Sequence, residues 1–271
     1  MRDGRPKNHV EGGRSSPKRL RVIIFRMAVA VALFSLLVGN IPRPAEAVTL
    51  NSDLVWFMGF TPGYAKLFND TSIQDQPSNV MLATSKQIVQ AGHYSAYYAY
   101  IGSPPGVDLR GYPTEDVSPS LKTFYVLLWV YVPSKVSGKQ VKITPDWISF
   151  ASLWLNDGGS STGADPICIN SDSSRTLHMN VHMINEILYS ASSIQWPFNT
   201  WFSIGIYGQL NPGTANSQLI IYLNGQQIIS FVGNLGPASD GLSQMHFGLY
   251  AAATQGTFAV YNDNIQLYIP S

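Results

Sequence analysis

Residues 218–232 read Gln-Leu-Ile-Ile-Tyr-Leu-Asn-Gly-Gln-Gln-Ile-Ile-Ser-Phe-Val, and this stretch gives the clearest indication of the fold. Two strand-like runs flank Asn224 and Gly225. These two residue types readily adopt the positive φ angles of the type I′ turn that joins paired strands. The stretch therefore predicts a β-hairpin.

Strand-like runs recur along the rest of the chain, with turn residues between them and almost no helical periodicity. Residues 121–132 would present apolar side chains on both faces of a strand, so they are expected to form a central strand buried between two layers. Residues 102–120, rich in Gly, Pro and Ser, are expected to form a long loop. Further strands are expected at residues 147–155, 201–210, 245–251 and 258–269. The pattern predicts an all-β fold, an antiparallel β-sandwich of jelly-roll type.

The N-terminal residues 1–47 read as a targeting segment and not as part of this fold. A basic lead precedes an apolar run at residues 27–38, and the small residues Ala45 and Ala47 follow a Pro-Arg-Pro sequence. This order is typical of a secretory signal peptide cleaved after Ala47, with an uncleaved signal anchor as the alternative. We therefore expect one exported domain, residues 48–271, in the secreted fraction or the cell envelope, with no membrane span of its own.

The charge of that domain differs from the charge of the whole chain. Residues 1–47 hold nine of the 17 Lys and Arg and three of the 16 acidic residues, which leaves a net charge near −5. An acidic, charge-poor domain argues against nucleic acid as a partner. Its Tyr, Ser, Asn and Gly suit neutral polyols instead. Cys168 is the single cysteine, so no intrachain disulfide can form, and it is expected to be a small buried hydrophobic residue.

Four motifs of the C-terminal third carry a family resemblance. They are Trp-Pro-Phe-Asn-Thr-Trp at 196–201, Ile-Ile-Tyr-Leu-Asn-Gly-Gln at 220–226, Met-His-Phe-Gly-Leu-Tyr at 245–250 and Val-Tyr-Asn-Asp-Asn-Ile at 260–265. In this order they resemble the closing strands of concanavalin A-like (LamG-like) jelly rolls, especially bacterial polysaccharide-lyase-like members. The resemblance covers roughly residues 120–271. It implies two stacked sheets with glycans received on the concave side, in a fold that hosts lectins, glycosidases and lyases.

The run from Leu177 to Met183 points to a functional face. Apolar and polar residues alternate there, so a strand would send one set into a core and the polar set to the other face. That polar set consists of two histidines and an asparagine, whereas any polar residue would keep an exposed strand face soluble. Rings and neutral polar groups match the C–H faces and hydroxyls of sugars, and Gly248 is expected to leave room for a ligand. The predicted ligand-binding residues are His178, Asn180, His182, Tyr207, His246, Tyr250, Tyr97 and Tyr100.

Catalysis is a second hypothesis. Residues 48–271 hold only two glutamates, Glu115 and Glu186, without the paired carboxylates of jelly-roll glycosidases. A polysaccharide lyase acting on a uronic-acid polymer is the alternative, but the resembled alginate-lyase families carry Arg-rich and Gln-x-His strands that this sequence lacks. A non-catalytic carbohydrate-binding protein is therefore the first hypothesis, and a structural envelope protein without a ligand is the third. If it is a lyase, the resemblance assigns carboxylate neutralisation to Asn180 or a loop Arg110, the base to His178 or His182, and the acid to Tyr250 or Tyr207.

Metal binding is predicted only at the final strand. His178 and His182 would lie about 13 Å apart on a strand, too far to share one ion. The resemblance implies a structural Ca²⁺ near Asp263, with a purely structural hydrogen bond of that carboxylate as the alternative. No other cofactor is expected.

Overall fold

The computed structural model describes residues 52–58, 74–76, 80–156, 166–191, 193–211, 214–235 and 241–270. All of them belong to one compact unit, Ala45–Ser271. The predicted signal segment, residues 1–47, lies outside the described residues. Within the described part of the chain, no helix has the length and apolar character needed to cross a membrane.

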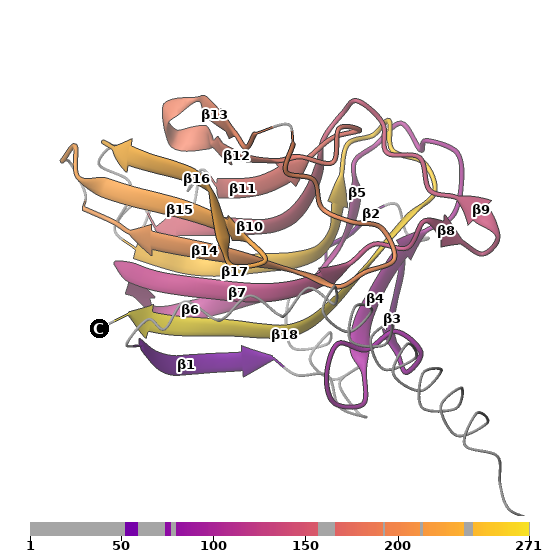
Figure 1. The fold of residues 1–271 in the computed structure, drawn as a ribbon, viewed down its shortest axis with the longest axis horizontal. Coiled ribbons are helices and arrows are strands. Elements are labelled where there is room, and N and C mark those ends of the chain that lie inside the picture. Colours follow the sequence, from indigo (N-terminus) through magenta and orange to yellow (C-terminus); the bar gives the residue numbers. More distant parts are fainter. Residues whose placement is uncertain are drawn as a thin grey trace, which may run out of the picture. The chain divides into compact units, whose positions relative to one another are not determined.

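Two eight-stranded antiparallel sheets make up this unit, and Figure 1 shows them stacked as two layers. The first contains the predicted hairpin and is called the hairpin sheet below. Its order is β16 (Gln226–Gly233), β15 (Ser217–Leu223), β14 (Phe202–Gln209), β7 (Thr123–Tyr131), β18 (Phe258–Pro270), β4 (Ser95–Tyr100) and β3 (Met81–Ser85), with β1 (Ser52–Met58) also paired to β18.

The second sheet carries His178 and His246 and is called the histidine sheet. Its order is β13 (Glu186–Tyr189), β12 (Leu177–Val181), β11 (Pro166–Ser171), β10 (Ile148–Asn156), β17 (Gly241–Ala251), β5 (Leu109–Tyr112) and β2 (Gln74–Gln76), with β6 (Thr114–Leu121) also paired to β17. A small ribbon of β8 (Lys135–Val136) and β9 (Lys139–Gln140) stands apart. The antiparallel β-sandwich is thus confirmed.

The local predictions that rest on turn chemistry and alternation hold. Asn224 and Gly225 have φ angles of 50° and 77°, as a type I′ turn requires. In β12, Leu177, Met179 and Val181 are fully buried in the core. The strand ends earlier than predicted, because residues His182–Ile184 form a 3₁₀ turn that leads into β13.

Two expectations were wrong. Residues 102–120 are not a long loop, because β5 and β6 both pair with β17. A strand partner distant in sequence supplies the backbone hydrogen bonds there, and local composition cannot show it. In β7, only one face enters the core, since Leu127, Trp129 and Tyr131 on the other face stay partly exposed.

Candidate functional site

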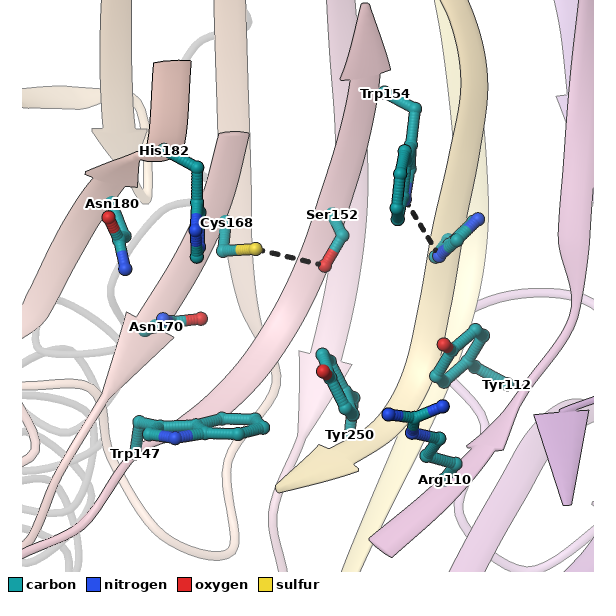
Figure 2. Close-up of a pocket in the computed structure, with 11 residues that line it drawn as sticks. Arg110, Tyr112, Trp147, Ser152, Trp154, Cys168, Asn170, Asn180, His182 and Tyr250 are labelled. Carbon is teal, nitrogen blue, oxygen red and sulfur yellow. Dashed lines mark hydrogen bonds between the residues drawn. The ribbon is translucent and has the colours of Figure 1, made fainter. Parts of the chain in front are cut away.

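A pocket of about 330 Å³ opens on the face of the histidine sheet that points away from the core (Figure 2). Strands β5, β10, β11, β12 and β17 supply most of its lining. The lining residues are Arg110, Tyr112, Trp147, Ser152, Trp154, Cys168, Asn170, Asn180, His182, His246 and Tyr250.

Alternation along the strands places these side chains. In β11, Ile167 and Ile169 are fully buried in the core. The alternate residues, Cys168 and Asn170, therefore face the pocket. In β10 the same alternation buries Leu153 and brings its two neighbours to the pocket. None of these four residues was predicted to belong to a site, although both strands show the period-two pattern in their sequences.

His246 lies in the pocket wall as a neutral ring with both nitrogens engaged. The Nε1–H of Trp154 donates to its Nδ1 at 3.2 Å, so the proton of the neutral ring belongs on Nε2. Nε2 in turn lies 2.7 Å from Oε1 of Gln244, whose amide nitrogen donates to Asp116. Burial lowers the pKa of His246 to about 4, against a partly opposing effect of the Asp116 charge. His246 is therefore a fixed and uncharged part of the pocket wall.

Aromatic rings form one end of the pocket. Tyr112 stacks on His246 with ring centroids 4.9 Å apart, and Trp147 meets Tyr250 edge-on at 4.7 Å. The guanidinium of Arg110 lies over the Tyr250 ring at 5.6 Å and 3.9 Å from a carboxylate oxygen of Asp108. Arg110 thus belongs to strand β5 and not to a loop, which corrects its predicted setting.

The tyrosines at this end are held as neutral phenols. Burial raises the pKa of Tyr112 to about 12, with a further contribution from Tyr250. Burial also raises the pKa of Tyr250, while the charge of Arg110 acts in the opposite direction. Both hydroxyls are therefore protonated at neutral pH and can donate hydrogen bonds.

Three well-buried residues of the lining, Ser152, Cys168 and Asn170, are uncharged. Asn170 is only 6% exposed, and no described residue is a hydrogen-bond partner of its Oδ1. Ser152 Oγ lies 3.4 Å from Cys168 Sγ. Cys168 is buried as predicted, but it faces the pocket and not the apolar core. Burial raises the pKa of its thiol to about 11, so it is uncharged.

The predicted polar row is only partly in the pocket. Asn180 and His182 line it, His182 from the 3₁₀ turn. His178 shares a strand face with Asn180 but does not belong to the lining, since its ring lies under Tyr189 at 5.2 Å and is 8% exposed. Burial lowers the pKa of His178. His246 and Tyr250, predicted to share a face, both line the pocket.

Three predicted ligand-binding tyrosines lie elsewhere. Tyr207, Tyr97 and Tyr100 belong to β14 and β4 of the hairpin sheet. Tyr100 packs in the core and its hydroxyl donates to the carbonyl of Ser103. The prediction that these rings join the histidines was wrong, because alternation separates the two faces of a strand but does not say which sheet holds it.

Gly248 has a different role from the one predicted. Its φ is +119°, and a Cβ there would lie 2.8 Å from the Gly111 carbonyl oxygen and 3.1 Å from Tyr98. Close backbone packing between β17 and β5 thus explains the glycine, without any need for ligand space.

The surroundings of Asp263 do not fit a calcium ion. Its carboxylate is 1% exposed and accepts hydrogen bonds from the backbone N–H groups of Gln90, Ala91 and Asn264. Donors aimed at both oxygens suit an anion and leave little for a cation. Within the described ranges no group of three His, Cys, Asp or Glu could hold a metal. These contacts favour the structural alternative, and calcium stays an untested prediction.

No family model and no curated protein matches the sequence. Solved structures do match. The chain is similar to endo-β-1,4-glucuronan lyase from the fungus Trichoderma reesei, with a TM-score of 0.60 and 12% identity over 79% of this chain and 95% of that one. It is also similar to a PL-14 alginate lyase from Aplysia kurodai, with a TM-score of 0.54 and 13% identity over 80% of this chain and 100% of that one. A third match is the cellulose-induced protein Cip1, with a TM-score of 0.50 and 15% identity over 72% of this chain and 86% of that one.

The chain shares the antiparallel β-jelly-roll fold of these solved structures. At 12–15% identity the likeness concerns the fold alone, and the first two of these structures are lyases by name whereas the third is not. The fold predicted from the C-terminal motifs is confirmed.

Proposed function

We propose that this protein is an exported carbohydrate-binding protein that holds part of a polysaccharide in the pocket of the histidine sheet without cleaving it. The observation that carries the proposal is Asn170, whose buried amide oxygen has no partner among the described residues. Such an unpaired acceptor costs about 1–3 kcal/mol. Asn170 lines the pocket, so a rotation of its amide that turns this buried oxygen toward the cavity would let a ligand hydroxyl donate to it and remove the cost.

The rest of the lining matches the same kind of ligand. Trp147, Tyr112 and Tyr250 offer ring surface to the apolar C–H side of a sugar, while Asn180 offers an amide to its hydroxyls. The volume of about 330 Å³ lies at the lower end of the roughly 300–1,000 Å³ typical of ligand sites. It suits a short segment of a glycan.

The protonation states favour binding over catalysis. β-Elimination requires a base that takes a proton from the sugar ring. The single nitrogen lone pair of the neutral His246 ring accepts a hydrogen bond from Trp154, so it is not free to take a proton. His178 is not part of the lining. Burial holds Tyr112 and Tyr250 as phenols, which cannot accept the proton at neutral pH. Of the two histidines in the lining, only His182 has a ring with no described hydrogen bond that would compete with proton uptake.

One observation favours a lyase as the second candidate. Arg110 lies over Tyr250, so a group that could neutralise a uronate carboxylate is next to a phenol that could protonate a leaving oxygen. In that case His182 would be the base and Asn180 would assist at the carboxylate. A structural envelope protein without a ligand is the third candidate.

Tryptophan fluorescence tests the binding proposal, because Trp147 and Trp154 both line the pocket. The probes are cello-, xylo- and manno-oligosaccharides together with alginate and polyglucuronate fragments. We expect at least one probe to change the emission of the wild-type protein. Asn170→Ala should weaken its binding about 5- to 100-fold, and Asn216→Ala, at an exposed turn before β15, should not.

Ultraviolet absorbance separates binding from catalysis. Lyases create a conjugated unsaturated uronate that absorbs, whereas binding does not. We expect no rise with any uronate polymer. A rise that His182→Ala abolishes would establish the lyase instead, and no response to any probe in either assay would leave the structural role.

A further inference from the structure

The outer face of the hairpin sheet, opposite the core, is almost free of charge. Its eight strands contain no Lys, Arg, Glu or His, and only two aspartates, Asp53 and Asp263. The carboxylate of Asp263 is buried against backbone amides. Solvent-facing strands usually carry ionised side chains, so a sheet face without them is unusual.

Half of the 14 tyrosines of the protein occupy this face instead. All seven alternate with residues that enter the core, and six of them are partly exposed, Tyr125 being the exception. They are Tyr97, Tyr125, Tyr131, Tyr207, Tyr222, Tyr261 and Tyr268.

Strand register arranges these rings in two rows. In the first, Tyr207, Tyr125 and Tyr268 lie directly opposite one another on β14, β7 and β18. The ring of Tyr125 is 6.2 Å from Tyr268 and also 6.2 Å from Tyr222 at the edge of the row. This arrangement requires a glycine at position 205, because the ring of Tyr125 lies over Gly205 and a Cβ there would collide with the Tyr125 hydroxyl.

The second row crosses β7, β18 and β4. There Tyr131 is opposite Tyr261, which is opposite Tyr97. The ring centroids of these neighbours are 5.7 Å and 4.6 Å apart. Tyr207 and Tyr97, which were predicted to share a face with the histidines, thus belong to this separate aromatic surface.

Amide groups lie beside the first row. The hydroxyl of Tyr207 donates to Gln209 Oε1 at 3.3 Å, and that of Tyr268 donates to Gln266 Oε1 at 2.7 Å. Each bond uses the oxygen of the glutamine and leaves its NH₂ group as a donor next to the ring. Gln218 lies directly opposite Gln209 and extends the amide row. Ring faces bordered by neutral amide donors and acceptors match the C–H faces and the hydroxyls of sugars.

From this arrangement we propose that the outer face of the hairpin sheet is a second carbohydrate-binding surface, which takes an uncharged polysaccharide independently of the pocket. The tyrosine rows contain no ionised groups, so electrostatic attraction cannot contribute to binding there. For the same reason, a neutral polysaccharide can contact the rings without the free-energy cost of removing water from a charged side chain. Stacking on the rings and hydrogen bonds from the glutamines are the interactions that remain.

Sedimentation of the purified protein with insoluble cellulose or insoluble xylan tests this surface. The double variant Tyr207→Ala/Tyr222→Ala removes two half-exposed rings and leaves the core unchanged, which thermal denaturation can verify. We expect retention by at least one of these polysaccharides and an apparent Kd at least about fivefold higher in the double variant. The pocket variant Asn170→Ala should bind as the wild type does, so the two proposed sites can fail separately.

Three results would overturn the proposal. The first is a wild-type protein that neither polysaccharide retains. The second is retention that the tyrosine double variant keeps or that Asn170→Ala loses equally. The third is a wild-type dimer in light scattering that becomes monomeric in the double variant, since this face would then be an interface between two copies of the chain.

Discussion

Replacing Gly248 by alanine should destabilise the protein far more than the same substitution at a glycine with open surroundings. Its φ of +119° lies where residues with a Cβ are strained by about 1–3 kcal/mol. The new Cβ would also lie 2.8 Å from the carbonyl oxygen of Gly111 and 3.1 Å from Tyr98. Overpacking of this kind adds about 1–3 kcal/mol. The sum is a loss of about 4 kcal/mol in the free energy of unfolding.

Gly138→Ala is the matched control, because Gly138 also has a positive φ, +79°, but nothing lies within 4 Å of its Cβ position. Backbone strain alone should cost it about 1 kcal/mol. Urea denaturation followed by tryptophan fluorescence measures both losses, and the expected difference is about 3 kcal/mol. If the two variants differ by less than about 1 kcal/mol, the close approach of β17 to β5 does not constrain Gly248, and the reasoning fails.

Three further predictions concern the pocket. Trp154→Phe should raise the pKa of His246 from about 4, because the lone pair of Nδ1 becomes free to bind a proton. An NMR titration in which the pKa of the variant stays near 4 would show that burial alone, and not this hydrogen bond, sets it. Since burial lowers the folded-state pKa of His246 from 6.5 to about 4, the unfolded chain takes up the proton first as the pH falls. Wild-type stability should therefore drop by up to about 3 kcal/mol between pH 6.5 and pH 4, and an equally steep drop in His246→Gln would count against this origin. Cys168, whose pKa is raised from 9.0 to about 11, should react with iodoacetamide about 100-fold more slowly in the folded protein than in urea; equal rates would show that the thiol is not buried.

The fold was predictable where the determinants are local. The turn at Asn224 and Gly225 needs positive φ angles that these two residue types supply, and alternation in β12 sends Leu177, Met179 and Val181 into the core. Strands β5 and β6 were missed because their Gly- and Pro-containing sequence becomes a strand only by pairing with β17, more than a hundred residues away.

The site was predictable only in part for a related reason. Asn180, His182, His246 and Tyr250 were identified from their residue types and spacing, and all line the pocket. The sequence did not reveal that Tyr207 and Tyr97 lie on the other sheet, since strand order is a property of the whole topology. Asn170 was missed because an asparagine between Ile169 and Ser171 stands out only once the face that it occupies is known.

A structure of the protein with a bound oligosaccharide tests the central claim most directly. The best binder from the fluorescence panel would be used. The account predicts an intact sugar segment in the pocket of the histidine sheet, with one hydroxyl donating to Oδ1 of Asn170 and a sugar face against Trp147 or Tyr250. A sugar bound only outside this pocket, or a cleaved product with an unsaturated uronate inside it, would contradict the account.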